Sequence, residues 1–132
     1  MNNQEPITKH QTMKRPFDLE ERTTQFAKSV IRLCQNLPFN PINQRLVSQV
    51  VGATGSIGAN YREANDALDE KDLLQRIRIS RREAKESLHW LELILEANQS
   101  KRSEIQALQN EAIELKKILS SIIKKLERRN QK

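Results

Sequence analysis

The chain has 132 residues, enough for one domain with a hydrophobic core. Its 4% aromatic and 30% charged residues disfavour a sheet protein and suit helices with solvated outer faces. The formal net charge of +6 favours an anionic partner such as nucleic acid. The single cysteine, Cys34, excludes an intrachain disulfide and fits a reducing compartment. No apolar run reaches the roughly 18 residues of a membrane span, and the start lacks a hydrophobic signal core. We therefore expect a cytoplasmic protein that makes no contact with a membrane.

Residues 1–16 are polar, contain two prolines and show no apolar period, which predicts a flexible basic N-terminal arm. We interpret this arm as a solvated tail, with weak contact to nucleic acid as the alternative. The first helix is expected to begin at Asp18, which can form a capping box with Glu21. Its apolar seam follows a near-heptad spacing that ends before Pro38; the seam is Leu19, Thr23, Phe26, Val30, Leu33 and Leu37.

The second helix is expected over about 41–66, with Asn40 as its cap and Pro41 at the first helical position. All three glycines of the chain lie in it, at positions 52, 55 and 58. Each costs roughly 1 kcal/mol relative to alanine, so we interpret this helix as the closely packed centre of a bundle. A polar line on it requires partners if it is buried. The predicted structural polar core is Ser56, Asn60, Glu63, Glu83 and Glu86.

A third helix is expected over about 70–97 with Asp69 as its cap, and a fourth from Ser103 with Gln106 completing a capping box. Both show heptad seams. These are Leu74, Ile77, Arg81, Ala84, Leu88, Leu91 and Leu95, then Ile105, Leu108, Ala112, Leu115, Leu119, Ile122 and Leu126. We predict an all-α fold, an antiparallel up-down-up-down four-helix bundle with left-handed packing over residues 17–128. Residues 129–132 are expected to form a basic tail.

No catalytic constellation is evident in the sequence. Glu86 and His89 have the Glu-x-x-His spacing of di-metal bundles, but such a centre needs two of these pairs and further carboxylates. The other histidine, His10, lies in the predicted arm, so one chain cannot complete the site. No phosphate-cradling glycine loop is present, because the glycines are helical. We therefore expect no enzymatic activity, no metal and no cofactor.

Basic residues on the last two helices are the candidate nucleic-acid contacts, since each exposed cation can neutralise a phosphate. They are Arg76, Arg78, Arg82, Lys85, Lys124, Lys125, Arg128 and Arg129. For Arg78 and Arg81 the alternative is pairing with carboxylates inside the bundle. Because the aromatic residues are scattered, the sequence provides no platform for stacking bases. We expect contacts to the nucleic-acid backbone that are strongly salt-sensitive.

The sequence also predicts self-association. The second helix is apolar or small over a wide arc, and several aliphatic residues fall outside the heptad seams. These are Ile79, Leu93, Ile94, Ile118 and Ile123. Broadening of the helices toward the core is the alternative explanation.

Two motifs resemble a known family. The first is Ser48-Gln49-Val50, Ser56-Ile57, Asn60 and Glu63; the second is the run from Arg78 to Leu91, with Glu83, Glu86 and Trp90. They resemble the small bundle proteins encoded within intervening sequences of bacterial large-subunit ribosomal RNA genes, together with the accessory variability determinant of diversity-generating retroelements. The chain departs from the family pattern at Gly52, where an arginine is usual, and at Ala64, where a glycine is usual.

The resemblance implies a four-helix bundle that assembles into a ring-like homopentamer. It also implies an accessory role, with RNA or DNA and a protein such as a reverse transcriptase as partners. Our first hypothesis is a non-enzymatic, oligomeric nucleic-acid-associated protein. The alternative is a protein-binding scaffold that has no affinity for nucleic acid.

Overall fold

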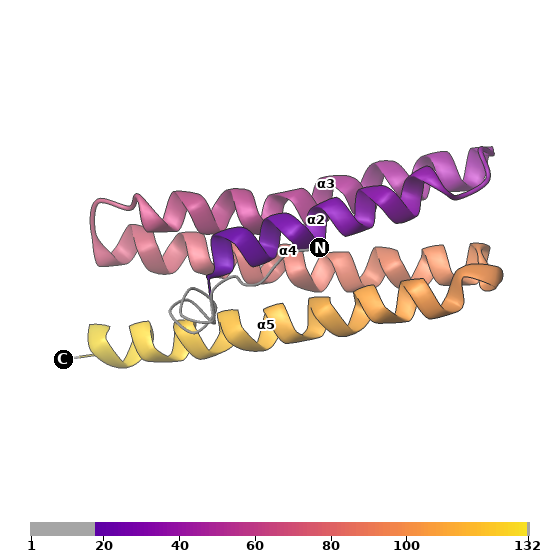
Figure 1. Ribbon diagram of the computed structural model, residues 1–132. Helices are drawn as coiled ribbons and strands as arrows, with labels where there is room; N and C mark the ends of the chain where they lie inside the picture. Colours follow the sequence, from indigo (N-terminus) through magenta and orange to yellow (C-terminus); the bar gives the residue numbers. More distant parts are fainter. Residues whose placement is uncertain (1–17, 132) are drawn as a thin grey trace, which may run out of the picture.

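The computed structural model describes residues 18–131, which form four long helices joined by short turns (Figure 1). They are α2 (Leu19–Gln35), α3 (Pro41–Asn65), α4 (Glu70–Ala97) and α5 (Arg102–Asn130), with a 3-10 turn, η1 (Gln99–Lys101), before α5. Successive helices run antiparallel, which confirms the up-down-up-down bundle (Figure 1). None of the helices in this range is both long and apolar enough to cross a membrane.

The C-terminal helix is longer than the sequence predicts. Helix α5 continues to Asn130, two residues beyond the expected end of the bundle at residue 128. The helix continues because residues 129 and 130 keep helical hydrogen bonding and no glycine or proline interrupts them. The predicted arm, residues 1–16, lies outside the described residues, as does Lys132.

Three helices begin at the caps that the sequence predicts. The side chains of Asp18, Asn40 and Asp69 accept backbone N–H groups three residues on, at 3.3, 2.8 and 2.8 Å. The expected cap at Ser103 is wrong, because the α5 start has no side-chain cap bond. The turn of η1 leads directly into α5, so Ser103 already lies inside helical backbone.

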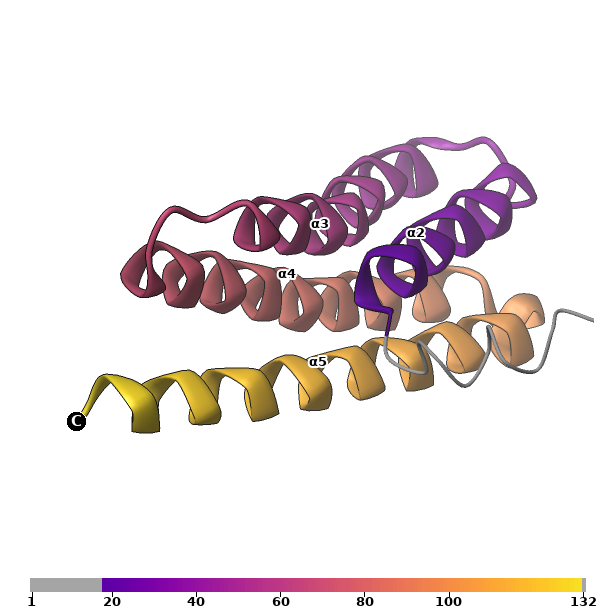
Figure 2. The ribbon, with the colours of Figure 1, turned by 60° about the vertical axis from the view of Figure 1, so that its left-hand side comes forward.

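The core forms where the four helices meet, and the heptad positions predicted on α2, α4 and α5 are buried or half-buried. Helix α4 packs against α3 on one flank and α5 on the other, whereas α2 packs mainly on α3 and only lightly on α5 (Figure 2). Because α4 has two neighbours, residues outside its predicted seam are buried as well; they are Ser80, Ser87 and Ile94. Ile94 and Ile123 therefore belong to the core, which agrees for these two residues with the alternative that the helices broaden toward it.

The glycines of α3 lie in different environments. A Cβ added at Gly58 would be 2.8 Å from Thr23 Oγ1, so this glycine allows α2 to approach α3 closely. Gly52 and Gly55 are exposed, and an added Cβ there would meet no atom within 4 Å. The interpretation of a closely packed glycine flank is correct for Gly58 only.

A buried amide pair closes one end of the bundle. Asn43 donates to Asn98 Oδ1 at 3.0 Å, and Asn98 donates to Asn43 Oδ1 at 2.9 Å. The two side chains also donate to the backbone carbonyls of Pro38 and Ile94. The pair ties the start of α3 to the turn between α4 and α5, and both amide oxygens are hydrogen-bonded.

Candidate nucleic-acid interface

The antiparallel pairing of α4 and α5 brings two basic stretches of the sequence side by side (Figure 1). Arg78 Nη2 donates to Glu127 Oε2 at 2.7 Å, and Arg81 Nη1 donates to Ser120 Oγ at 3.3 Å. These two contacts show which residues of the two helices lie opposite each other. Residues 76–85 carry five cations and one carboxylate, and residues 116–129 carry six cations and one carboxylate. The N-terminal half of α4 and the C-terminal half of α5 thus form one strongly positive part of the surface.

Six exposed cations on this part of the surface are called here the basic face. They are Arg78, Arg82 and Lys85 on α4, and Lys117, Lys124 and Arg128 on α5. The α4 residues are three or four positions apart, so they share one side of the helix. Lys117 and Lys124 each precede by three positions an α5 residue that contacts α4, namely Ser120 and Glu127. Both lysines consequently lie next to the contact with α4.

Four of the six cations of the basic face have no opposing carboxylate within bonding distance. Among residues 18–131, Arg82, Lys85, Lys124 and Arg128 take part in no ion pair. Arg78 pairs with Glu127, and Lys117 lies 3.7 Å from Glu114, but all four of these side chains are exposed. Exposed pairs of this kind exchange readily with other partners, because each is worth little in water.

Two carboxylates border the basic face on α4. Burial raises the pKa of Glu83, the nearby charge of Glu86 raises it further, and Arg82 lowers it. Arg82 therefore interacts with a carboxylate on its own helix, but that carboxylate is half-buried and partly desolvated. The guanidinium itself is exposed and can contact a phosphate.

Three of the predicted nucleic-acid contact residues lie outside the basic face. Arg76 is half-buried and donates to Asn60 Oδ1 at 3.2 Å, so it faces α3 and does not belong to the basic face. Arg129 pairs with Glu70. Lys125 is exposed but lies about 100° around α5 from Lys124. The sequence-based prediction missed Lys117, although its spacing of seven residues from Lys124 would have placed it on the same side of the helix.

The predicted polar core is only partly internal. Ser56 and Glu83 are half-buried, while Glu63 and Glu86 are exposed, so a buried layer that includes these two carboxylates is wrong for the single chain. Asn60 is half-buried and donates to the carbonyl of Ser56 at 2.9 Å. The Asn60 side-chain oxygen accepts a hydrogen bond from Arg76, so Asn60 makes a contact between α3 and α4.

The buried polar contacts that do join helices involve residues that the sequence-based prediction did not select. Ser80 Oγ donates to the carbonyl of Ile57 at 2.8 Å, from α4 to α3. The Asn43–Asn98 pair is the second such contact. Neither has a local signature, because the partners are far apart in the sequence.

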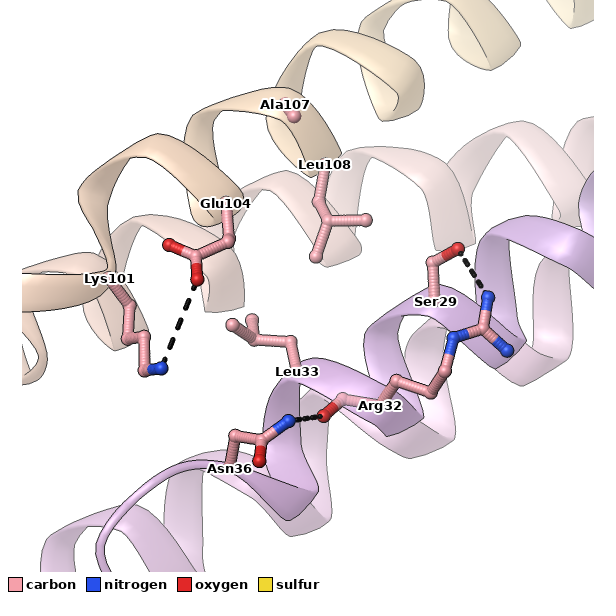
Figure 3. Close-up of a pocket in the computed structure, with 8 residues that line it drawn as sticks. All are labelled: Ser29, Arg32, Leu33, Asn36, Lys101, Glu104, Ala107 and Leu108. Carbon is pink, nitrogen blue, oxygen red and sulfur yellow. Dashed lines mark hydrogen bonds and ion pairs between the residues drawn. The ribbon is translucent and has the colours of Figure 1, made fainter.

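Two grooves flank helix α2. One, of about 350 Å³, lies between α2 and α5 and is lined by Leu33 and Leu108, with Arg32 and the Lys101–Glu104 pair at its rim (Figure 3). The other, of about 320 Å³, lies between α2 and α3 beside Gly55. Both are open and neither contains a cluster of catalytic groups.

Residues 18–131 contain many carboxylates but one histidine and one cysteine. Within residues 18–131, no group of three or more His, Cys, Asp or Glu side chains is arranged to hold a metal ion. His89 is exposed and packs edge-on against Trp90. Burial raises the pKa of the Cys34 thiol to about 11, so the thiol stays protonated at neutral pH and acts as a small apolar group.

Comparison with known proteins agrees with the fold. A family model described as "23S rRNA-intervening sequence protein" matches residues 16–121. A crystal structure of a protein of unknown function from the S23 ribosomal protein family of Bacteroides thetaiotaomicron superposes with a TM-score of 0.70 at 30% sequence identity. That match covers 80% of this chain and 97% of the other. No curated protein shows significant similarity to the chain.

Proposed function

The chain belongs to the family of 23S rRNA-intervening sequence proteins, and from this premise we propose that it binds nucleic acid through the basic face. The observation that carries the proposal is the convergence of two distant basic stretches on one side of the α4–α5 pair. Each stretch alone is typical of a solvated helix surface. Together they concentrate charge in a way that attracts a polyanion.

The charges of the basic face favour contacts with the phosphates of a nucleic acid. The cations that have no ion pair, such as Lys85, Lys124 and Arg128, can each displace a counterion from a phosphate. The basic face offers arginine and lysine side chains in open solvent. Binding through it is therefore directed at the backbone, and its affinity falls steeply as salt rises.

The test compares two variants with the same total charge. In the first, Arg82, Lys85, Lys124 and Arg128 are changed to glutamine. In the control, four exposed cations outside the basic face are changed to glutamine instead, namely Lys28, Arg32, Arg45 and Arg102. Affinity for a labelled RNA or DNA is measured by fluorescence anisotropy over a range of salt concentrations.

We expect the first variant to bind much more weakly than the unmodified protein. The slope of log K against log salt should fall by up to about 3.6, or about 0.9 for each phosphate that is no longer neutralised. The control should keep nearly the full slope. Equal effects in both variants would mean that binding follows net charge and not the basic face. If the unmodified protein binds no better than a neutral protein at low salt, the scaffold alternative is favoured.

Self-association is part of the same proposal. Several copies in one particle would present several basic faces to one polyanion, and such multivalent binding raises avidity although each face binds as before. A homopentamer and an accessory role beside a reverse transcriptase stay predictions that rest on resemblance.

A further inference from the structure

We propose that the ligand of the basic face is a double-stranded nucleic acid, with the α4 row and the α5 row of cations each following one strand. This inference rests on the proposed function and deepens it. The α4 row is Arg78, Arg82 and Lys85, and the α5 row is Lys117, Lys124 and Arg128.

The two rows have a fixed geometry. The α4 row extends over seven residues and the α5 row over eleven, which corresponds to about 10 and 16 Å at 1.5 Å per residue. The axes of packed helices lie about 8–10 Å apart. The buried packing of α4 on α5 holds the two helices in register, with Arg78 opposite Glu127 and Arg81 opposite Ser120. The rows therefore cannot slide or separate to follow a flexible chain.

This arrangement matches a duplex better than a single strand. A duplex presents two strands of phosphates, held apart by a groove, with about one charge per 1.7 Å of its axis. Both rows can contact a duplex at once, and the duplex loses little conformational entropy because it is already rigid. A single strand offers one line of phosphates, so it can engage one row, or it must fold back across the surface and lose conformational entropy.

The basic face also lacks the groups with which proteins hold single strands. Those proteins stack successive bases on several aromatic side chains. On α4 and α5 the aromatic side chains are His89 and Trp90 alone. Trp90 is half-buried, which leaves His89 as the one exposed ring on these two helices, a turn beyond Lys85. One ring cannot form a platform for consecutive bases.

The experiment measures binding of the full chain to four probes of equal length, about 20 nucleotides per strand. These are an RNA duplex, a DNA duplex, and an unstructured single strand of each. Two row variants, Arg82→Gln/Lys85→Gln and Lys124→Gln/Arg128→Gln, are compared with the control Lys28→Gln/Arg45→Gln. Thermal unfolding by circular dichroism verifies that each variant keeps its helices.

We expect both duplexes to bind at least about tenfold more tightly than the single strands at the same salt. Either row variant should lower the salt slope for the duplex by about 1.8, because each variant neutralises two fewer phosphates. The control should leave the slope unchanged.

Two results would overturn the inference while leaving the proposed function intact. One is single strands that bind as tightly as duplexes; the other is a row variant that does not alter duplex binding although its counterpart does. Absence of salt-dependent binding to all four probes would instead overturn the proposed function itself.

Discussion

At the scale of single residues, the three glycines of α3 show how environment decides what a residue contributes. Gly58 lies against Thr23, whose hydroxyl donates to the carbonyl of Leu19 at 2.6 Å. Gly52 and Gly55 face open space in the single chain. The same residue type therefore permits close packing at one position and has no packing role within the chain at the other two.

Substitution by alanine should separate these roles. Gly55→Ala is expected to stabilise the chain by about 1 kcal/mol through helix propensity. Gly58→Ala should destabilise it by about 1–3 kcal/mol, because the new methyl group overpacks the α2–α3 contact. Urea unfolding measures both changes, and Thr23→Ala combined with Gly58→Ala should recover part of the stability. Destabilisation by Gly55→Ala would contradict the open environment and point to another molecule covering this face.

Glu83 gives a prediction about pH. Its pKa is raised in the folded protein, mainly by burial, so ionisation of Glu83 opposes folding. The cost is present at neutral pH and disappears as the pH falls below the ordinary value of 4.5. Glu83→Gln should therefore raise the free energy of unfolding at pH 7 and have little effect near pH 3. A benefit that is larger at acid pH would contradict the assignment.

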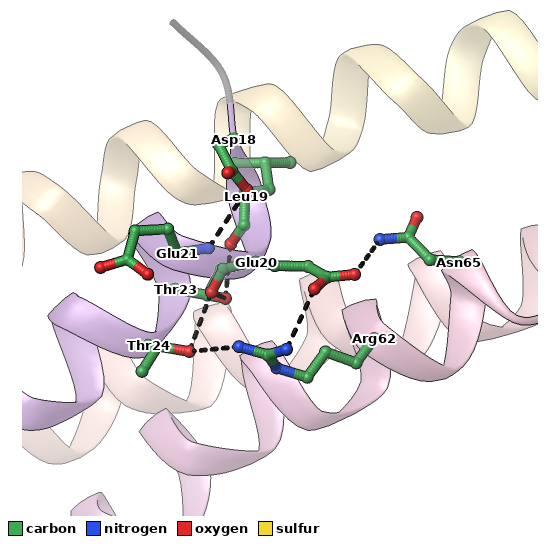
Figure 4. Close-up of polar contacts among 8 residues, drawn as sticks. All are labelled: Asp18, Leu19, Glu20, Glu21, Thr23, Thr24, Arg62 and Asn65. Atoms are coloured by element: carbon green, nitrogen blue, oxygen red, sulfur yellow. Dashed lines mark hydrogen bonds and ion pairs between the residues drawn. The ribbon is translucent and has the colours of Figure 1, made fainter. Parts of the chain in front are cut away.

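At the scale of elements, α2 is the helix that packs least extensively against the rest of the bundle. It packs mainly on α3, and grooves lie on both of its sides. Polar contacts fasten it: Arg62 and Asn65 of α3 both donate to the Glu20 carboxylate, at 3.0 and 2.6 Å (Figure 4). On the other side, Arg22 binds Glu111 of α5 through two hydrogen bonds at 2.7 and 2.9 Å.

Removing the Arg22–Glu111 contact should loosen α2 selectively. Glu111→Ala is expected to cost about 1 kcal/mol, since a bidentate arginine–carboxylate contact is stronger than an ordinary surface pair. Hydrogen exchange followed by mass spectrometry should show faster exchange in α2 with α4 unchanged. Glu104→Ala is the matched control, because Glu104 is an exposed carboxylate of α5 whose ion pair is with the nearby Lys101, at 3.9 Å. Equal effects of the two substitutions would show that the contact does not fasten α2.

At the scale of the whole molecule, the surface contains apolar groups that the single chain leaves uncovered. Phe39 is 87% exposed and Leu68 is 96% exposed, at turns between helices. Around Gly52 and Gly55, α3 also exposes backbone that no side chain covers. Phe39 and Leu68 lie at opposite ends of α3 and do not form one patch, but the predicted assembly would allow other copies of the chain to cover them.

Native mass spectrometry of the purified full chain tests the assembly prediction. We expect five copies per particle, as the resemblance implies, with additional mass that nuclease treatment removes. Five copies without nuclease-sensitive mass would support the ring and favour the scaffold alternative. A monomer at micromolar concentration would contradict the assembly and leave the exposed apolar groups to other partners.

The sequence alone determined the features that depend on neighbours along the chain. Heptad spacing placed Leu19, Ile77 and Leu115 in the core. The caps at Asp18, Asn40 and Asp69 could be recognised because the bonded atoms lie three residues apart. Helix number, order and length follow from such short-range patterns.

The tertiary structure decided whatever depends on how each helix is rotated and which helix lies beside it. A basic stretch predicts exposed cations, but only the packing of α4 between α3 and α5 turns Arg76 toward Asn60 and brings Lys85 and Lys117 onto one face. The Asn43–Asn98 pair and the contact of Gly58 with Thr23 join residues 55 and 35 positions apart. Periodicity along one helix fixes which residues turn inward, but it contains no information about the side chains that another helix places opposite them.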